Sequence, residues 1–179
     1  MLTKYDKNHQ RKIAKEIRAT LVYSGLNQVK SSRIVQKIIN SKEFINSKDI
    51  ALYYPLAGEI DLRGLLNVKG KNFYLPRCIG NEMEFVLYQS DEFLIDGDFK
   101  VKVPIGPSVN SDILDIIYIP ALMANRNFYR LGYGRGFYDR FLSKNALHAL
   151  KYIVVASELI SSDFIQDEFD YKCDGIISA

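Results

Sequence analysis

Residues 113–120 read Ile113-Leu114-Asp115-Ile116-Ile117-Tyr118-Ile119-Pro120 and form the most apolar run of this 179-residue chain. A short, continuous apolar run that ends at a proline is typical of a strand buried on both faces of a parallel sheet. We therefore take residues 113–119 as the central strand of the fold and expect the other elements to lie around it.

Shorter segments with strand or helix patterns occur on both sides of this run. Strand composition is found at residues 49–54, 72–75, 84–89, 152–156 and 174–178, where the first two segments end at Pro55 and Pro76. Helical periodicity is found at residues 6–23, 29–40, 62–68 and 137–142. Residues 90–112 are rich in Asp, Gly, Pro, Ser and Asn and predict a long loop region with short pieces of order. Strands that alternate with helices predict an α/β protein whose mostly parallel sheet is covered on both faces.

Length and composition indicate one ordinary folded domain over residues 1–179, with 47% apolar and 25% charged residues. No apolar run approaches the ~18 residues that would span a membrane, and the N-terminal residues lack the apolar stretch of a secretory signal. We therefore expect a cytoplasmic protein with no membrane partner. Cys78 and Cys173 stand apart from each other and from His9 and His148, which disfavours a zinc site or a disulfide. A metal ion, if bound, is expected on carboxylates.

Positive charge is concentrated at the start of the chain. Residues 1–48 hold eleven Lys and Arg against three Asp and Glu, whereas the rest holds thirteen against eighteen. This split is compatible with a basic arm for nucleic acid, with cations that reach the phosphates or carboxylates of a small ligand, or with a solvated helix face.

The densest chemical signal is a glycine-rich stretch between the central strand and the helix that begins near Phe137. It reads Arg130-Leu131-Gly132-Tyr133-Gly134-Arg135-Gly136-Phe137-Tyr138-Asp139-Arg140. Glycines let the backbone approach a ligand closely, and a loop that opens a helix directs unpaired N–H groups at an anion. The spacing matches neither a Walker A loop nor the dinucleotide fingerprint. The pattern therefore predicts an anion-binding loop, with a merely tight connection as the alternative.

Two carboxylates stand out by their positions. Asp139 falls on the first turn of the helix after the glycine-rich stretch, where it could ligate Mg²⁺ beside phosphates or simply stabilise the helix N-terminus. Glu59, in Gly58-Glu59-Ile60, follows the strand that ends at Pro55, and ligands of open α/β sheets bind at such strand ends. Taken by itself, this position favours a solvated loop residue over a ligand contact.

The order of these motifs resembles the 5-formyltetrahydrofolate cyclo-ligase family over about residues 7–178. The most specific feature is the glycine-rich block that ends in Tyr138-Asp139-Arg140. The other matching pieces are Lys7 and Arg11, Tyr53-Tyr54-Pro55 with Gly58-Glu59-Ile60, Leu75-Pro76-Arg77, Ile119-Pro120, Asp170 and Asp174. The resemblance implies a three-layer αβα sandwich.

The resemblance also implies a reaction. Members of the family convert 5-formyltetrahydrofolate to 5,10-methenyltetrahydrofolate with ATP and Mg²⁺, releasing ADP and phosphate. The γ-phosphoryl group of ATP goes to the formyl oxygen, and N10 then attacks the activated carbon and expels phosphate. Such a reaction needs positioning and charge neutralisation, and we expect no dedicated acid or base. The implied partners are a folate and ATP, with no nucleic acid, and we expect a monomer.

Site residues follow from the resemblance position by position. The implied ATP-binding residues are Lys7, Arg11, Arg130, Leu131, Gly132, Tyr133, Gly134, Arg135, Gly136, Phe137 and Tyr138, of which Arg135 could also stabilise the transferred phosphate. The implied folate-binding residues are Arg11, Tyr54, Glu59, Tyr133 and Phe137. The implied Mg²⁺ ligands are Asp139 and Asp170.

The chain departs from the family pattern at several places. Gln10 replaces an apolar residue before Arg11, so Lys12, Lys15 or Arg18 are alternative phosphate contacts. Asn125 and Phe128 stand where the family commonly has Asp and Gly, so we expect this turn to be built differently. Asp170 lies in a stretch that also contains Asp163, Asp167 and Asp174, so its assignment as a metal ligand rests on the match of the tail to the family alone.

Two other functions remain compatible with the sequence. One is another ATP-dependent phosphoryl transferase of similar fold, because function resides in the site and not in the fold. The other is a basic RNA-binding protein that retains the fold, although the basic segment lacks interleaved aromatic residues. Glu59 distinguishes the folate enzyme from another phosphoryl transferase, since a substrate other than folate would not require this residue.

Overall fold

A six-stranded sheet forms the centre of the protein, with strand order β10-β9-β6-β1-β2-β3. The computed structural model describes residues 6–98, 101–145, 148–161 and 166–179. Neighbouring strands are parallel from β10 to β2, and only β3 is antiparallel to its neighbour. The sheet strands are β1 (Asp49–Ala51), β2 (Asn72–Ile79), β3 (Glu82–Leu87), β6 (Ile116–Pro120), β9 (Leu150–Val154) and β10 (Gly175–Ile177). Two small hairpins pair β4 (Leu94–Asp96) with β5 (Lys102–Pro104) and β7 (Met123–Ala124) with β8 (Arg130–Leu131).

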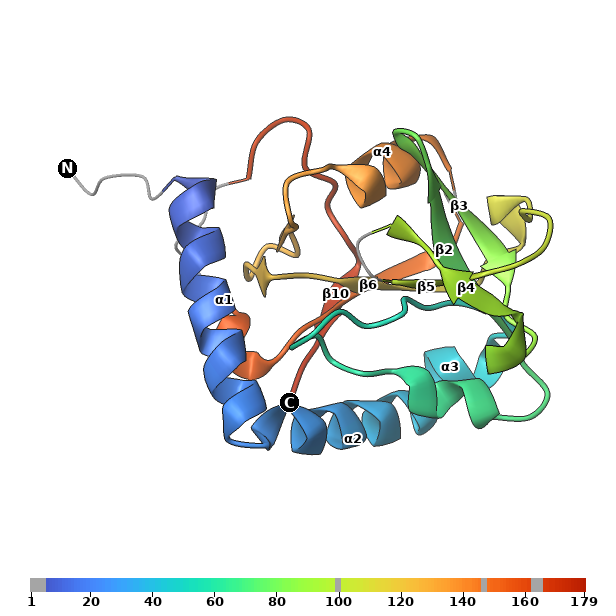
Figure 1. Ribbon diagram of the computed structural model, residues 1–179, viewed down its shortest axis with the longest axis horizontal. Helices are drawn as coiled ribbons and strands as arrows, with labels where there is room; N and C mark the ends of the chain where they lie inside the picture. Colours follow the sequence, from blue (N-terminus) through green and yellow to red (C-terminus); the bar gives the residue numbers. More distant parts are fainter. Residues whose placement is uncertain (1–5, 99–100, 146–147, 162–165) are drawn as a thin grey trace.

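Helices cover both faces of this sheet, which gives the predicted three-layer αβα sandwich (Figure 1). Helices α2 (Leu26–Ile39) and α3 (Lys42–Asn46) lie on one face, and α4 (Phe137–Lys144) lies on the other. Helix α1 (Lys7–Tyr23) stands upright beside the end of the sheet towards which β6 runs. Short 3₁₀ helices occur at Arg63–Asn67, Asp91–Phe93, Ser111–Ile113 and Ser157–Leu159. The chain thus brings its first helix to the edge where parallel strands end.

The predicted central strand is the core of the molecule. Ile116, Ile117 and Ile119 are each 0% exposed, and Tyr118 packs against Tyr152 of the neighbouring strand. Strand β6 begins at Ile116, because residues 111–113 form a 3₁₀ turn and do not pair with the sheet. Helix α4 joins this core through Phe141, whose ring meets the edge of Phe85 of β3.

Several predicted elements differ from the structure; the strand predicted at residues 49–54, for example, ends at Ala51. The strand expected to end at Pro76 continues to Ile79. Tyr88 N donates to Phe73 O, and in an antiparallel pair every second residue forms such hydrogen bonds with the partner strand. Counted from Phe73, the residues of β2 that bond to β3 are therefore the odd-numbered ones. Pro76 is one of the residues between these, so its nitrogen points away from β3 and towards the β1 side of the strand. On that side β1 pairs only with residues 72–74 and does not reach Pro76. The missing N–H therefore costs no ladder bond. The helix expected at residues 62–68 is a 3₁₀ helix.

The turn between β7 and β8 is built from Asn125 and Phe128. Asn125 Oδ1 accepts hydrogen bonds from Asn127 N and Tyr129 N, as an aspartate in its place could. Phe128 has a φ of 69° and is the one non-glycine residue with positive φ among those that the structure describes. The turn therefore adopts at Phe128 a conformation that glycine takes without strain.

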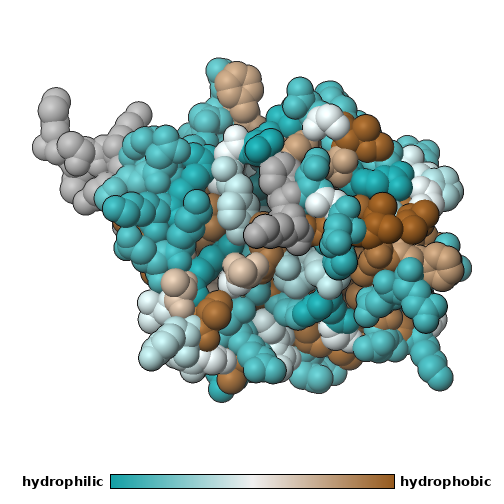
Figure 2. Space-filling model, viewed as in Figure 1, coloured by the Kyte–Doolittle hydropathy of each residue, from teal (hydrophilic) through white to brown (hydrophobic). Residues whose placement is uncertain are grey.

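The surface is largely hydrophilic over α1, whereas apolar side chains gather over the region of β2 to β5 (Figure 2). Exposed apolar residues of that region are Ile79, Leu87, Phe93 and Ile95. In the described part of the chain, no helix has both the length and the apolar character required to cross a membrane.

The strain at Phe128 can be measured with a matched pair of variants. Both Phe128→Gly and Phe128→Ala remove the ring, but only alanine keeps a Cβ in the left-handed region. We expect Phe128→Gly to be more stable than Phe128→Ala by about 1–2 kcal/mol, the cost of that conformation. Denaturant unfolding measures the difference. At an ordinary position alanine is the more stable of the two, so that order would contradict strain here.

Candidate active site

One large pocket lies where the parallel strands end, with a volume of about 1080 Å³. Segments that are far apart in the sequence line it, among them α1, the loop after β1, strands β2 and β3, the β4–β5 hairpin, the glycine-rich loop and the loop that precedes β10. Every residue that the sequence predicts for ATP, folate or metal lines this pocket. The structure therefore gathers the predicted residues into one site.

The glycine-rich loop is shaped by positive φ at two of its glycines. Gly134 has a φ of +100° and Gly136, which caps α4, has a φ of +66°. Arg11 Nε of α1 donates to Gly132 O at 2.9 Å, and a Cβ on Gly134 would lie 3.4 Å from the Arg11 guanidinium. The backbone of the loop thus lies directly against a cation of α1, and the positive φ of Gly134 favours glycine there.

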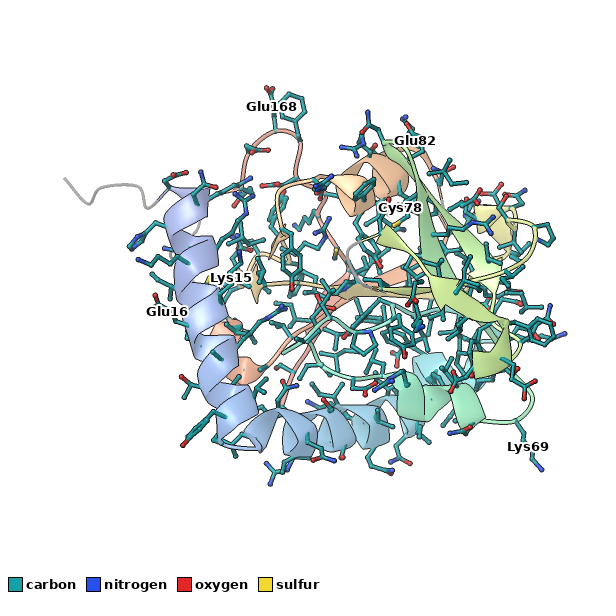
Figure 3. The ribbon with its side chains drawn as sticks, viewed as in Figure 1. Lys15, Glu16, Lys69, Cys78, Glu82 and Glu168 are labelled. Carbon is teal, nitrogen blue, oxygen red and sulfur yellow. The ribbon has the colours of Figure 1, made fainter. Side chains whose placement is uncertain are left out.

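The alternatives to Lys7 and Arg11 lie elsewhere. Lys12 and Lys15 are exposed and do not line the pocket; Lys15 lies on the surface of α1 beside Glu16 (Figure 3). Gln10 is 3% exposed, so it lies at a buried position of the helix although it is polar. The register with Lys7 and Arg11 at the pocket is therefore the one that the structure has.

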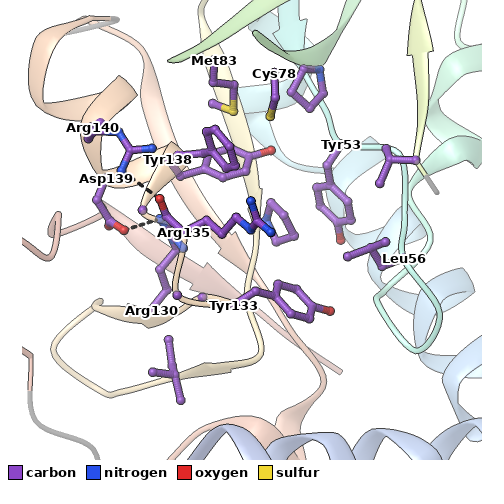
Figure 4. Close-up of a pocket in the computed structure, with 18 of the residues that line it drawn as sticks. Tyr53, Leu56, Cys78, Met83, Arg130, Tyr133, Arg135, Tyr138, Asp139 and Arg140 are labelled. Carbon is purple, nitrogen blue, oxygen red and sulfur yellow. Dashed lines mark hydrogen bonds and ion pairs between the residues drawn. The ribbon is translucent and has the colours of Figure 1, made fainter. Parts of the chain in front are cut away.

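Each predicted metal ligand is paired with a cation. Asp139 Oδ2 lies 2.9 Å from Nη2 of Arg130, and the guanidinium of Arg130 also lies over the ring of Tyr138 (Figure 4). Asp170 Oδ2 accepts from Lys7 Nζ at 2.6 Å, and Lys7 reaches Asp167 at the same distance. These two carboxylates, which line the pocket, hold the pKa of the Lys7 ammonium above its usual value although its partial burial acts in the opposite direction.

The two carboxylates fit a magnesium ion that is completed by phosphate. Tyr171 N, from the residue after Asp170, donates to Asp139 Oδ1 at 3.3 Å, so the two ligand segments are in contact. The described residues contain no group of three or more His, Cys, Asp or Glu that could hold a metal alone. Mg²⁺ usually takes one or two carboxylates together with phosphate oxygens and waters, which matches this donor set. Asp167 also lines the pocket, Asp174 does not, and Asp163 lies outside the described residues.

Glu59 is a buried carboxylate at the other side of the pocket. Its residue is 5% exposed, and Oε2 accepts from Leu56 N at 2.9 Å. The Tyr133 hydroxyl donates to Oε1 at 3.3 Å, and Arg18 Nη1 lies 3.8 Å from the same oxygen. Burial raises the pKa of the Glu59 carboxyl, and the Arg18 charge and the two hydrogen bonds only partly oppose this. Glu59 is therefore an oriented acceptor for N–H groups of a ligand.

Tyrosines surround this carboxylate. Burial raises the pKa of Tyr133 to about 12 and that of Tyr138 well above its usual value, so both hydroxyls stay protonated at neutral pH. The Tyr138 hydroxyl is buried and has no hydrogen-bond partner among the residues that the structure describes. Tyr54 carries the Arg63 guanidinium over its ring. A flat aromatic ligand would find both apolar surface and hydroxyl groups here.

Sequence reasoning missed some residues of the site. Tyr53, Leu56 and Arg77 also line the pocket, and Arg18 lies behind Glu59 and Tyr133 without lining it. Tyr53 and Arg77 belong to motifs that carry the resemblance, which was the available signal. Arg18 was not missed but given another role: the sequence offers it as an alternative phosphate contact, whereas it contacts Tyr133 and Ala121 behind the pocket.

These features define an α/β protein whose strand ends hold a glycine-rich loop beside cations, two carboxylates paired with cations, and an aromatic compartment with a buried acid. Comparison with known proteins gives the same class. The sequence model of the 5-formyltetrahydrofolate cyclo-ligase family matches residues 3–177. The chain therefore belongs to the 5-formyltetrahydrofolate cyclo-ligase family of enzymes, as the motifs predict.

Individual relatives agree over nearly the whole chain. The 5-formyltetrahydrofolate cyclo-ligase of Mycoplasma genitalium is 29% identical over 96% of this chain and 97% of that protein. A 5,10-methenyltetrahydrofolate synthetase structure from Aquifex aeolicus is similar with a TM-score of 0.84, at 31% identity over 96% of this chain and 89% of the other. The corresponding structure from Mycoplasma pneumoniae has a TM-score of 0.78, at 25% identity over 96% and 98%.

The two ion pairs of the pocket predict different losses of stability. The Arg130 side chain is 4% exposed, so Asp139→Ala leaves a buried cation unpaired, and we expect the free energy of unfolding to fall by about 3 kcal/mol. The matched variant is Asp170→Ala, because the Lys7 side chain is 23% exposed and keeps Asp167. For that variant we expect a loss below about 1 kcal/mol. Denaturant unfolding of both variants measures this difference, and equal losses would contradict it.

Proposed function

We propose that this chain converts 5-formyltetrahydrofolate to 5,10-methenyltetrahydrofolate with ATP, releasing ADP and phosphate. The observation that carries the proposal is the coexistence, in one pocket, of a cation-lined glycine loop and a buried carboxylate among tyrosines. The first suits a polyphosphate, and the second suits a flat heterocycle with N–H donors. The family to which the chain belongs supports the same reaction.

The proposed reaction explains why the pocket needs both a nucleotide side, at the glycine-rich loop, and a folate side, at Glu59 and the tyrosines. The oxygen of an N-formyl group is a poor leaving group, so the γ-phosphoryl group of ATP is transferred to it and ADP leaves. N10 of the folate then attacks the activated carbon, and the C–O bond breaks with release of phosphate. Positioning of the two substrates and neutralisation of the phosphate charge supply most of the catalysis in such a transfer. This scheme requires no dedicated general base.

On the nucleotide side, Lys7, Arg11 and the backbone of residues 130–138 would bind the phosphates. Arg11 already contacts the loop at Gly132, and the Arg135 side chain points into the pocket (Figure 4). A guanidinium there is in position to stabilise the charge of the transferred phosphoryl group. Asp139 and Asp170 would hold Mg²⁺, which would neutralise phosphate charge.

On the folate side, Glu59 would accept hydrogen bonds from N–H groups of the pterin. Tyr54, Tyr133 and Phe137 would contact the folate, with Arg11 available to both ligands. Tyr133 lies in the glycine-rich loop and Phe137 begins α4 directly after it, so this stretch would border both substrates.

The basic N-terminal part gives little support to RNA binding. Many of its cations are engaged within the protein: Lys7, Arg11 and Arg18 at the pocket, Lys30 with Glu158 and Ala179 O, and Lys37 with Ser178 O. A basic arm for nucleic acid needs its cations directed at solvent.

The reaction predicts a specific pattern of variants. Purified protein mixed with 5-formyltetrahydrofolate and MgATP should give the near-ultraviolet absorbance of the methenyl product, and omission of ATP or Mg²⁺ should abolish it. Glu59→Gln should reduce the rate by at least about a hundredfold, because a buried charged acceptor is lost, while ATP affinity stays nearly unchanged. The control is Lys15→Gln, an exposed cation of α1 that does not line the pocket. A protein that binds ATP but forms no methenyl product would assign the pocket to another phosphoryl acceptor.

Folate binding should also depend on pH. Since the pKa of Glu59 is raised above its ordinary value of 4.5, the carboxyl takes up its proton at a higher pH than an exposed glutamate does. Affinity for folate is therefore full above this raised pKa and is lost as the pH falls through it. The acid limb of kcat/KM against pH for folate reports the value in the free enzyme. Glu59→Gln should lack this limb; its persistence would assign the limb to another group.

A further inference from the structure

Arg18 is a buried arginine that the proposed reaction does not use directly. It is 6% exposed and projects from α1 to the underside of the pocket without lining it. Its Nη2 donates to the carbonyl oxygen of Ala121, which follows β6, and its Nη1 donates to the Tyr133 hydroxyl. The same Nη1 lies 3.8 Å from Glu59 Oε1, and the guanidinium lies 5.7 Å from the centre of the Tyr133 ring. One side chain thus joins α1, the end of β6, the glycine-rich loop and the Glu59 loop.

The direction of the hydrogen bonds in this cluster follows from its chemistry. A guanidinium can only donate, and an ionised carboxylate can only accept. The Tyr133 hydroxyl therefore accepts from Arg18 and donates its proton to Glu59 Oε1. Arg18 in this way fixes the orientation of the hydroxyl as well as the charge beside Glu59.

Glu59 keeps acceptor capacity for a ligand. An ionised carboxylate has about four lone-pair sites, two on each oxygen. Leu56 N takes one on Oε2, and the Tyr133 hydroxyl takes one on Oε1. Each oxygen retains a site, so the carboxylate can accept two neighbouring N–H groups. Leu56 N and the Tyr133 hydroxyl are neutral donors. Arg18 supplies the positive charge that favours the ionised form of the Glu59 carboxyl.

We propose that Arg18 is a positioning residue for folate: it keeps Glu59 as an ionised, oriented acceptor and directs the Tyr133 hydroxyl to it. This inference rests on the proposed function, because it concerns the folate half of that pocket. Arg18 acts through Glu59 and Tyr133 and does not touch the substrate. Arg11, which lies two helical turns earlier on α1, holds the same loop at Gly132 on the nucleotide side. Loss of Arg18 should therefore affect folate much more than ATP.

The first test measures equilibrium binding to Arg18→Gln, with 5-formyltetrahydrofolate and MgATP titrated separately. We expect the Kd for folate to rise at least about tenfold and the Kd for MgATP to change less than about twofold. The matched control is Lys151→Gln, which removes another buried cation, 4% exposed, from a strand outside the pocket. Unfolding midpoints of both variants separate loss of fold from loss of binding.

Two further readouts distinguish positioning from a merely structural role. The pKa of the Glu59 carboxyl, followed by ¹³C NMR in the free protein, should be higher in Arg18→Gln than in the wild type. In the Glu59→Gln background, Arg18→Gln should cause little additional loss of folate affinity, because the group through which it acts is already gone. Arg18→Lys, which restores the charge without the fork of donors, should recover part of the affinity. If Arg18→Gln does not fold, the same readouts on Arg18→Lys decide.

Specific outcomes would overturn the inference. It fails if the folate Kd rises no more in Arg18→Gln than in Lys151→Gln, if folate and MgATP affinities fall equally, or if the effects of Arg18→Gln and Glu59→Gln simply add. A wild-type protein that forms no methenyl product and binds no folate would overturn the proposed function, and this inference with it. A fully active wild type with an unchanged Arg18→Gln overturns the inference alone.

Discussion

The glycine-rich loop is held against the sheet by arginines of α1, and the pocket depends on this contact. Arg11 binds the carbonyl oxygen of Gly132, and Arg18 binds the hydroxyl of Tyr133 in the same loop. A loop with positive φ at Gly134 and Gly136 has many accessible conformations when unfolded, so it needs external contacts to stay in one. Since α1 also brings Lys7 to the C-terminal loop, one helix contacts the glycine-rich loop, the Glu59 loop and the C-terminal loop.

Charge compensation explains how so many ionic groups can share this pocket. Arg130 is paired with Asp139, Lys7 with Asp170 and Asp167, and Arg18 with Glu59. A cation that is buried without a partner costs several kcal/mol, so such pairs make the pocket stable before any ligand binds. A bound polyphosphate with its metal would offer the exposed partners, Lys7 above all, an equivalent set of opposite charges. Arg130 and Asp139 line the pocket and would meet phosphate and Mg²⁺ as well, whereas the Arg18–Glu59 pair contains no proposed phosphate or metal contact.

Local patterns were sufficient for the order of the six sheet strands and of α1, α2 and α4, whereas most pocket residues came from the resemblance to the family. The apolar run of β6, the helical period of α1 and the glycine block each follow from neighbours in the chain. The predicted strand end at Pro76 was wrong, because a proline ends a strand only where its nitrogen faces a partner strand. The nitrogen of Pro76 faces the side of β1, and β1 is too short to reach it. The contacts of Arg18 could not be predicted in the same way. They join residues 18, 59, 121 and 133, and only the tertiary fold brings these together.

Glu59 illustrates how a site residue constrains stability. Because its pKa is raised on folding, its contribution to stability is greatest at acid pH and falls as the pH rises from the unfolded pKa through the folded one. At neutral pH the ionised carboxylate therefore costs folding free energy. Its removal alone would not recover this cost, since Arg18 would then be a buried cation without a carboxylate. Removal of either member alone leaves the other without its buried partner, so each single loss is expected to destabilise the fold. The buried acid and its arginine thus depend on each other, at the position where the proposed folate would need an acceptor.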